Sequence, residues 1–172
     1  MTKSPNRPNP PKKPNPKPAL PTTEIIAKSK SNMNAEQKML QSIRNLKDGL
    51  LRNYEIKALV NESQDLGEYL KEQELKTNQI RKFLDAVNRL KVELARDKNE
   101  SFSVIETDIF LLKPKLAYAT ARQDSNRGNP VKPLSNVITE AIDKVEDTPD
   151  FYRLVQLIES IIAYHKAAGG RN

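Results

Sequence analysis

The chain has 172 residues, enough for one domain with a real core plus appendages. Apolar residues make up 37% and charged residues 30%, with five Gly and no Trp, which is typical of a helical protein with a modest core. The absence of Cys excludes disulfides and thiolate metal sites, and the single His excludes multi-histidine metal sites and leaves little basis for a nucleophile–base triad. With no secretory signal and no apolar run near ~18 residues, we expect a cytoplasmic protein without a membrane segment.

The net charge of +7 belongs mostly to residues 1–32, which hold seven Lys and Arg against Glu24 alone. This segment also contains eight of the twelve prolines, so we expect a disordered, polyproline-like tail. Two short patterns, Pro8-Asn9-Pro10-Pro11 and Pro11-Lys12-Lys13-Pro14, resemble ligands of proline-recognition domains, but such patterns arise readily in proline-rich tracts, which favours a solubilising spacer with weak attraction to polyanions. Nucleic-acid binding by the folded part must therefore rest on local basic patches rather than on the total charge.

Helical signals begin near Asn34, a predicted N-cap. One apolar stripe runs from Met39 to Ala58, and a second one, on a different face, runs from Ile56 to Leu70 around the polar residues 61–65. The pattern is compatible with a kinked or broken helical hairpin, and also with one long helix whose exposed stripe contacts a partner. We treat residues 33–76 as a helical extension.

Thr77 is the next predicted cap, opening a helix through about Arg96 with an apolar stripe from Ile80 to Leu94. Lys82, Arg89 and Arg96 recur every seventh residue on the opposite face, with Arg81 on the flank. This row suits a polyphosphate, but an outer helix face is also where solvated charge belongs. Ser101 is expected to cap a third helix, which leads to Lys113 and Pro114.

Residues 112–122 form the most distinctive stretch. Pro114 fits the first position of a helix, with a bend at Lys113. At 100° per residue, Lys115, Tyr118, Ala119 and Arg122 share one face, next to a core face that contains Leu112 and Leu116. A planar or anionic partner could approach the first face closely; alternatively it is a solvated helix end with Tyr118 covering the edge of the core.

Two further helices follow a polar loop at residues 123–130. Pro133 begins the first of them, and Thr148-Pro149-Asp150 reads as N-cap, first residue and acidic first-turn residue of the second, which ends at Gly169-Gly170. His165 lies within an apolar stripe, which favours a packed imidazole, or one bonded to the final carbonyls, over a catalytic role. No segment alternates with period two. We therefore predict an all-α, compact bundle of about five or six helices, with the main domain at residues 77–172.

Local charges are unevenly distributed in this domain. Residues 76–96 and 113–132 each carry a balance of +4, whereas residues 134–152 carry −4. Such a domain could bind a polyanion on one side, or stack head-to-tail with copies of itself.

Three blocks, at residues 77–83 (TNQIRKF), 112–122 (LKPKLAYATAR) and 162–170 (IAYHKAAGG), resemble in order and spacing the small subunit of type III-A CRISPR effector complexes, the Csm complexes. The resemblance covers about residues 77–170. It implies a helical bundle that performs no catalysis and binds no metal or cofactor, several copies of which line up beside the backbone subunits. These copies border the groove in which guide RNA pairs with target RNA, while cleavage belongs to the backbone and large subunits.

From the resemblance and the local charge we expect a non-catalytic RNA-binding and scaffolding subunit for antiviral defense. Its partners would be guide RNA and target RNA, the backbone and large subunits, and further copies of itself. The alternative is a helical adaptor whose Pro-rich tail recruits a partner domain. The candidate RNA contacts, which would hold phosphates without reading bases, are Arg81, Lys82, Arg89, Lys113, Lys115, Tyr118, Arg122, Arg127 and Lys166.

Overall fold

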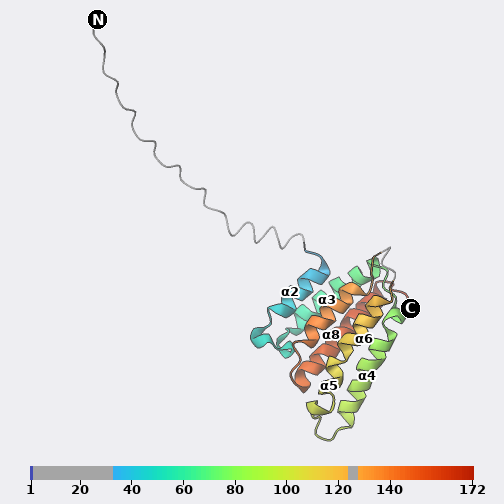
Figure 1. The fold of residues 1–172 in the computed structure, drawn as a ribbon. Helices are drawn as coiled ribbons and strands as arrows, with labels where there is room; N and C mark the ends of the chain where they lie inside the picture. Colours follow the sequence, from blue (N-terminus) through green and yellow to red (C-terminus); the bar gives the residue numbers. More distant parts are fainter. Residues whose placement is uncertain (2–32, 124–127) are drawn as a thin grey trace. The chain divides into compact units, whose positions relative to one another are not determined.

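The computed structural model describes Met1, residues 33–123 and residues 128–172 (Figure 1). The chain divides into two units at residue 32, and every helix of the described residues belongs to the second unit, residues 33–172. The expectations for the Pro-rich tail and for Arg127 lie outside the described residues.

In its described part the second unit is built from helices and contains no strand, which confirms the all-α prediction. Only Leu111 separates α5 from α6. If these two are counted as one kinked helix, the described residues form six α-helices, which agrees with the predicted five or six. The α-helices are α2 (Ala35–Arg44), α3 (Ile56–Glu72), α4 (Arg81–Arg96), α5 (Glu106–Phe110), α6 (Leu112–Ala121), α7 (Lys132–Ile142) and α8 (Thr148–Ala167). Short 3₁₀ helices are η1 (Lys47–Gly49), η2 (Leu51–Asn53), η3 (Thr77–Gln79) and η4 (Phe102–Val104).

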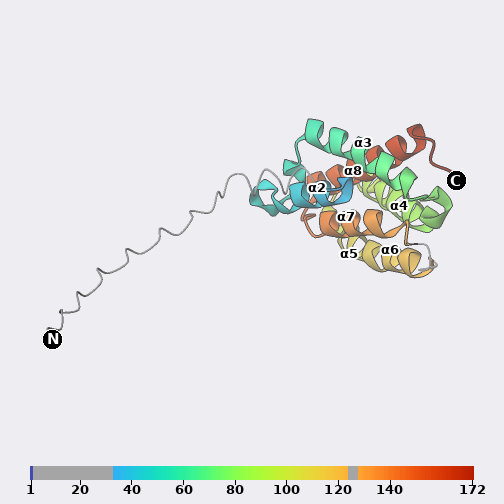
Figure 2. The same cartoon turned by 90° about the horizontal axis from the view of Figure 1, so that it is seen from above.

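The helices pack around one hydrophobic core. Helix α3 lies along α8, α2 packs on α3 and α7, and α6 packs on both α7 and α4 (Figures 1 and 2). Core residues such as Leu59 and Leu66 come from the extension predicted at residues 33–76, and others such as Leu90 and Ile158 come from the rest of the domain. The extension is thus packed into the same core, which the sequence pattern left open.

The first two helices form the broken hairpin that was one of the two interpretations. The break lies between Arg44 and Ile56, where Asp48 and Gly49 both adopt positive φ, of 56° and 70°. A positive φ cannot continue a right-handed helix, so the chain turns here. The polar residues 61–65 do not interrupt the helix, because they lie inside α3.

One predicted cap is confirmed and two boundaries were wrong. Asn34 caps α2 through a reciprocal capping box with Gln37. Thr77 instead opens η3, where its N–H and hydroxyl both donate to the Arg171 carbonyl, and α4 begins only at Arg81. Asp147, rather than Thr148, caps α8, and its side chain accepts a hydrogen bond from the Asp150 N–H at 3.1 Å.

Two further predicted helix starts, those at Ser101 and Pro114, were also wrong. Ser101 makes no side-chain cap and precedes the 3₁₀ helix η4 rather than an α-helix. Pro114 is the third residue of α6 instead of the first, and the bend falls at Leu111 instead of Lys113. Pro114 still lies within the first turn, where its missing N–H costs no helical hydrogen bond.

His165 is a packed core imidazole, as predicted. Its side chain is fully buried. Its Nε2 lies 2.9 Å from the carbonyl oxygen of Leu75, in the loop that follows α3. Gly170 covers the ring: a Cβ at this position would lie 2.2–2.5 Å from three ring atoms. The imidazole therefore ties the end of α3 to the end of α8.

Candidate nucleic-acid interface

Helices α4 and α6 lie side by side in opposite directions. Arg81 at the start of α4 lines the same hollow as Arg122 at the end of α6, and Arg89 further along α4 lines another with Lys115 near the start of α6. Both helices turn apolar stripes inward, including the buried Leu90 of α4 and Leu116 of α6. Their outer side chains consequently flank a shallow groove on the surface.

The groove is most basic at the end that holds Arg122. Here it encloses a volume of about 430 Å³, and its described lining contains four cations and no carboxylate. The side chains of Gln79 and Gln123 close this end, with Gln79 Nε2 donating to Gln123 Oε1. The lining residues are Asn78, Gln79, Arg81, Lys82, Phe83, Lys115, Tyr118, Ala119, Arg122 and Gln123.

The groove continues toward the middle of α4. Lys82 and Lys115 line this second stretch as well, together with Asp85, Ala86 and Arg89. We call the two stretches together the α4–α6 groove. Asp85 is the only carboxylate in its described lining, against five Lys and Arg side chains.

Tyr118 and Arg122 form the most defined contact of this groove. The Arg122 guanidinium carbon lies 5.6 Å from the centroid of the Tyr118 ring, within the range of a cation–π interaction. The Tyr118 side chain is 59% exposed. The ring is therefore accessible to a ligand in the groove.

Several basic side chains outside the groove are occupied by ion pairs. Arg44 pairs with Glu140 at 2.9 Å, Lys91 with Glu159 at 2.5 Å, and Arg52 with both Asp147 and Asp150. Lys113 pairs with Asp143. Within the described part of the chain, no such pair involves Arg81, Lys82, Arg89, Lys115 or Arg122.

These ion pairs also use most of the acidic segment at residues 134–152. Four of its five carboxylates, all except that of Glu146, are paired within the chain. Little unpaired negative charge is left there to attract a basic face of a second copy, so charge alone gives weak support to head-to-tail stacking.

Six of the nine sequence-predicted residues come together in the groove: Arg81, Lys82, Arg89, Lys115, Tyr118 and Arg122. Lys113 is turned to Asp143, and Lys166 lies on α8, where it lines a mostly apolar hollow against α4. Arg127 lies outside the described residues. The sequence interpretation missed Gln79 and Gln123, which are 44 positions apart and carry no signal of their pairing.

The chain matches a known protein family over most of its length. The family model described as Csm2 Type III-A matches residues 53–171, more than two thirds of the chain. The chain belongs to the Csm2 family. It is a small subunit of a type III-A CRISPR effector complex.

The match to Csm2 is longer than the resemblance seen in the sequence. It begins at Asn53 and so includes the whole of α3, which packs on α8, instead of starting at Thr77. No curated protein matches the chain. In the part of this Csm2 chain that the structure describes, no helix has the length and apolar character needed to cross a membrane.

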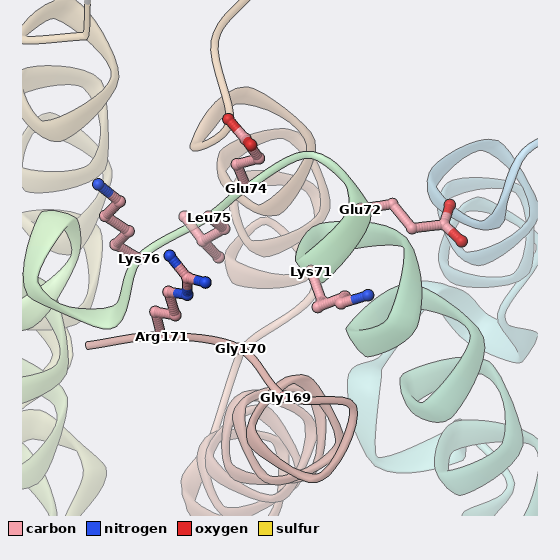
Figure 3. Close-up of a pocket in the computed structure, with 8 residues that line it drawn as sticks. All are labelled: Lys71, Glu72, Glu74, Leu75, Lys76, Gly169, Gly170 and Arg171. Carbon is pink, nitrogen blue, oxygen red and sulfur yellow. The ribbon is translucent and has the colours of Figure 1, made fainter.

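A second hollow, of about 440 Å³, lies where the loop after α3 meets the end of the chain. Its charged lining is mixed, with Lys71, Lys76 and Arg171 against Glu72 and Glu74. Figure 3 shows Lys76 and Arg171 on one side, and Lys71 and Glu72 turned to the other. These charges do not converge on a common point, so the α4–α6 groove is the better candidate for an anionic ligand.

Proposed function

We propose that this Csm2 subunit holds RNA by its phosphates in the α4–α6 groove and acts as a non-catalytic scaffold of the effector complex. The observation that carries the proposal is the convergence of Arg81, Lys82, Arg89, Lys115 and Arg122 from two helices on one groove with a single carboxylate in its described lining. Arginine forks and lysine ammonium groups are the usual partners of phosphate oxygens.

The position of two of these cations supports a role in binding rather than in folding. Arg81 and Lys82 are the first two residues of α4. Positive side chains at a helix N-terminus face the positive end of the helix dipole, which disfavours them by a few tenths of a kcal/mol to about 1 kcal/mol. A bound phosphate would remove this conflict, because it is attracted by the dipole and by both cations.

The described groove lacks the side chains that most often serve as base or nucleophile near neutral pH. Its ionisable side chains are Lys, Arg, one Tyr and Asp85, and these include no imidazole or thiol that could serve as a base or nucleophile near neutral pH. The one histidine of the chain is buried beneath Gly170. A role in holding RNA without cleaving it agrees with this set of side chains.

The proposed partners follow from membership in the complex: guide RNA and target RNA, the backbone and large subunits, and further copies of this subunit in the cytoplasm. Because the groove cations face phosphates rather than base edges in this proposal, base pairing between guide and target supplies the sequence specificity.

The salt dependence of RNA binding tests the proposal. The double variant Lys115→Ala/Arg122→Ala should bind RNA more weakly, and the slope of log K against log salt should become shallower by about 1 to 2, since each lost phosphate contact contributes ~0.7–0.9. The matched control is Lys38→Ala/Lys57→Ala, which removes the same charge from exposed residues of α2 and α3. Equal changes of slope in both double variants would show that the groove is not the RNA site.

A further inference from the structure

Tyr118 is far more exposed than a tyrosine that packs in the core. Tyr54, in contrast, is only 2% exposed, and its hydroxyl donates to Glu62 at 2.6 Å. Tyr118 places a ring that is 59% exposed inside the most basic part of the α4–α6 groove. An exposed aromatic ring among cations adds a flat apolar surface that a phosphate by itself does not use.

The surroundings of the ring combine flat, apolar and cationic surfaces. The planar guanidinium of Arg122 lies at the ring, with its central carbon 5.6 Å from the centroid. Ala119 and Phe83, both at most 9% exposed, form an apolar floor beside it. The volume of about 430 Å³ lies within the range of pockets that hold small organic ligands, ~300–1,000 Å³. This arrangement fits a base flanked by its phosphates better than it fits phosphates alone.

We propose that Tyr118 and Arg122 form a stacking platform for one nucleobase that is unpaired at the point where the RNA strand crosses the groove. The inference rests on the proposed function, because Lys115, Arg81 and Lys82 then hold the adjoining phosphates. Bases inside a duplex are already stacked on their neighbours and offer no face to a tyrosine, whereas unpaired bases stack readily on aromatic and guanidinium planes.

The platform has little means of choosing among bases. The groove is lined by three amide side chains, Asn78, Gln79 and Gln123, and the two glutamines are engaged with each other and with the backbone. Gln79 accepts from the Lys76 N–H and donates to Gln123, which in turn donates to the Ala119 carbonyl oxygen. Stacking tolerates any base because each has a π-face, so we expect no strong sequence preference.

A short single-stranded RNA containing 2-aminopurine tests the proposal, since the fluorescence of this base is quenched when it stacks on an aromatic ring. The wild type and Tyr118→Phe should quench the probe, whereas Tyr118→Ala should not and should bind the RNA about tenfold more weakly. Phe110→Ala is the matched control: Phe110 is also a large exposed side chain, 46% exposed, but it does not line the groove. It should leave quenching and affinity unchanged.

Two comparisons separate this inference from the proposed function. Replacing the probed nucleotide by an abasic one should weaken wild-type binding and leave Tyr118→Ala binding unchanged. If Tyr118→Ala quenches and binds as the wild type does while Lys115→Ala/Arg122→Ala shows the shallower salt slope, the phosphate contacts stand and the platform is wrong. If Tyr118→Ala weakens single-stranded and duplex RNA equally, stacking on an unpaired base is likewise excluded. If neither variant changes RNA binding, both proposals fail.

Discussion

Gly67 of α3 touches the backbone of α8 at His165. A Cβ at Gly67 would lie 2.6 Å from the His165 backbone nitrogen and 2.8 Å from the Tyr164 Cβ. Such distances are shorter than packed atoms adopt, so only glycine permits this approach. The contact brings the buried Leu66 and Leu70 of α3 against α8 and explains a glycine in the interior of a helix.

Gly67→Ala should lower the free energy of unfolding by about 1–3 kcal/mol, because the added methyl group must push two helix backbones apart. Alanine has a higher helix propensity than glycine, by about 1 kcal/mol, which acts in the opposite direction. Urea unfolding of the variant and of Asn61→Ala, at an exposed position of the same helix, measures the difference. A Gly67→Ala protein more stable than the wild type would show that the two helices are not held at this distance.

Asp150 is a buried acceptor for three donors. Its Oδ1 accepts from the Arg52 N–H at 2.6 Å, and its Oδ2 from the Glu146 N–H at 3.1 Å and the Arg52 guanidinium at 3.2 Å. The side chain has no exposed surface. It therefore joins η2 to the start of α8.

Asp150→Ala should cost about 1–3 kcal/mol in the free energy of unfolding, because it leaves the Arg52 and Glu146 N–H groups without their acceptor, while the Arg52 guanidinium keeps its pair with Asp147. Asp143→Ala is the control, since this carboxylate is 52% exposed and its pair with Lys113 should contribute about 0.2–1 kcal/mol. Urea unfolding of both variants gives the comparison, and similar losses in the two would contradict a special role of the buried position.

The buried imidazole of His165 predicts a pH dependence of stability. Burial lowers the pKa of His165, the nearby Lys166 lowers it further, and the hydrogen bond to Leu75 raises it in part. Protonation would place a second donor at Nδ1, which is buried and has no partner in the described part of the chain. The folded state thus binds this proton less readily than the unfolded state does.

The contribution of His165 to stability should be complete above the unfolded pKa of ~6.5 and fall as the pH drops from there toward the lower pKa of the folded protein. The free energy of unfolding, measured by urea between about pH 7.5 and about pH 5, should decrease for the wild type. His165→Gln can keep a donor to the Leu75 carbonyl but cannot titrate, so its decrease over this range should be smaller. Identical pH slopes would exclude the imidazole as the source.

Local signals in the sequence predict the helices well. The capping residue Asn34, Pro133 near the start of α7 and the apolar stripe of α4 each depend on neighbours within a few positions. The shared face of Lys115, Tyr118 and Arg122 likewise follows from helical periodicity alone and is confirmed by the lining of the groove. A face of one helix can be read from spacing because the backbone geometry is regular.

Relationships between helices could not be predicted in the same way. The groove depends on α4 lying against α6, and a single sequence does not state which helix faces meet. The pair of Arg52 and Asp150 joins residues 98 positions apart, and that of Gln79 and Gln123 joins residues 44 apart. The ion pair that occupies Lys113 was missed for the same reason, since its partner Asp143 belongs to another segment.

Lys113 and Lys115 therefore provide a test within one helix. They lie two positions apart on α6, so their side chains leave the helix in different directions: Lys113 pairs with Asp143, and Lys115 lines the groove. Lys115→Ala should weaken RNA binding and make the salt slope shallower by about one phosphate contact. Lys113→Ala should leave the slope unchanged and lower the free energy of unfolding by at most about 1 kcal/mol, because the lost ion pair is partly exposed.

The two variants carry the same charge, so the total charge cannot explain a difference between them. A slope reduced equally by both would mean that RNA contacts extend along α6 beyond the groove and that the ion pair of Lys113 opens when RNA binds.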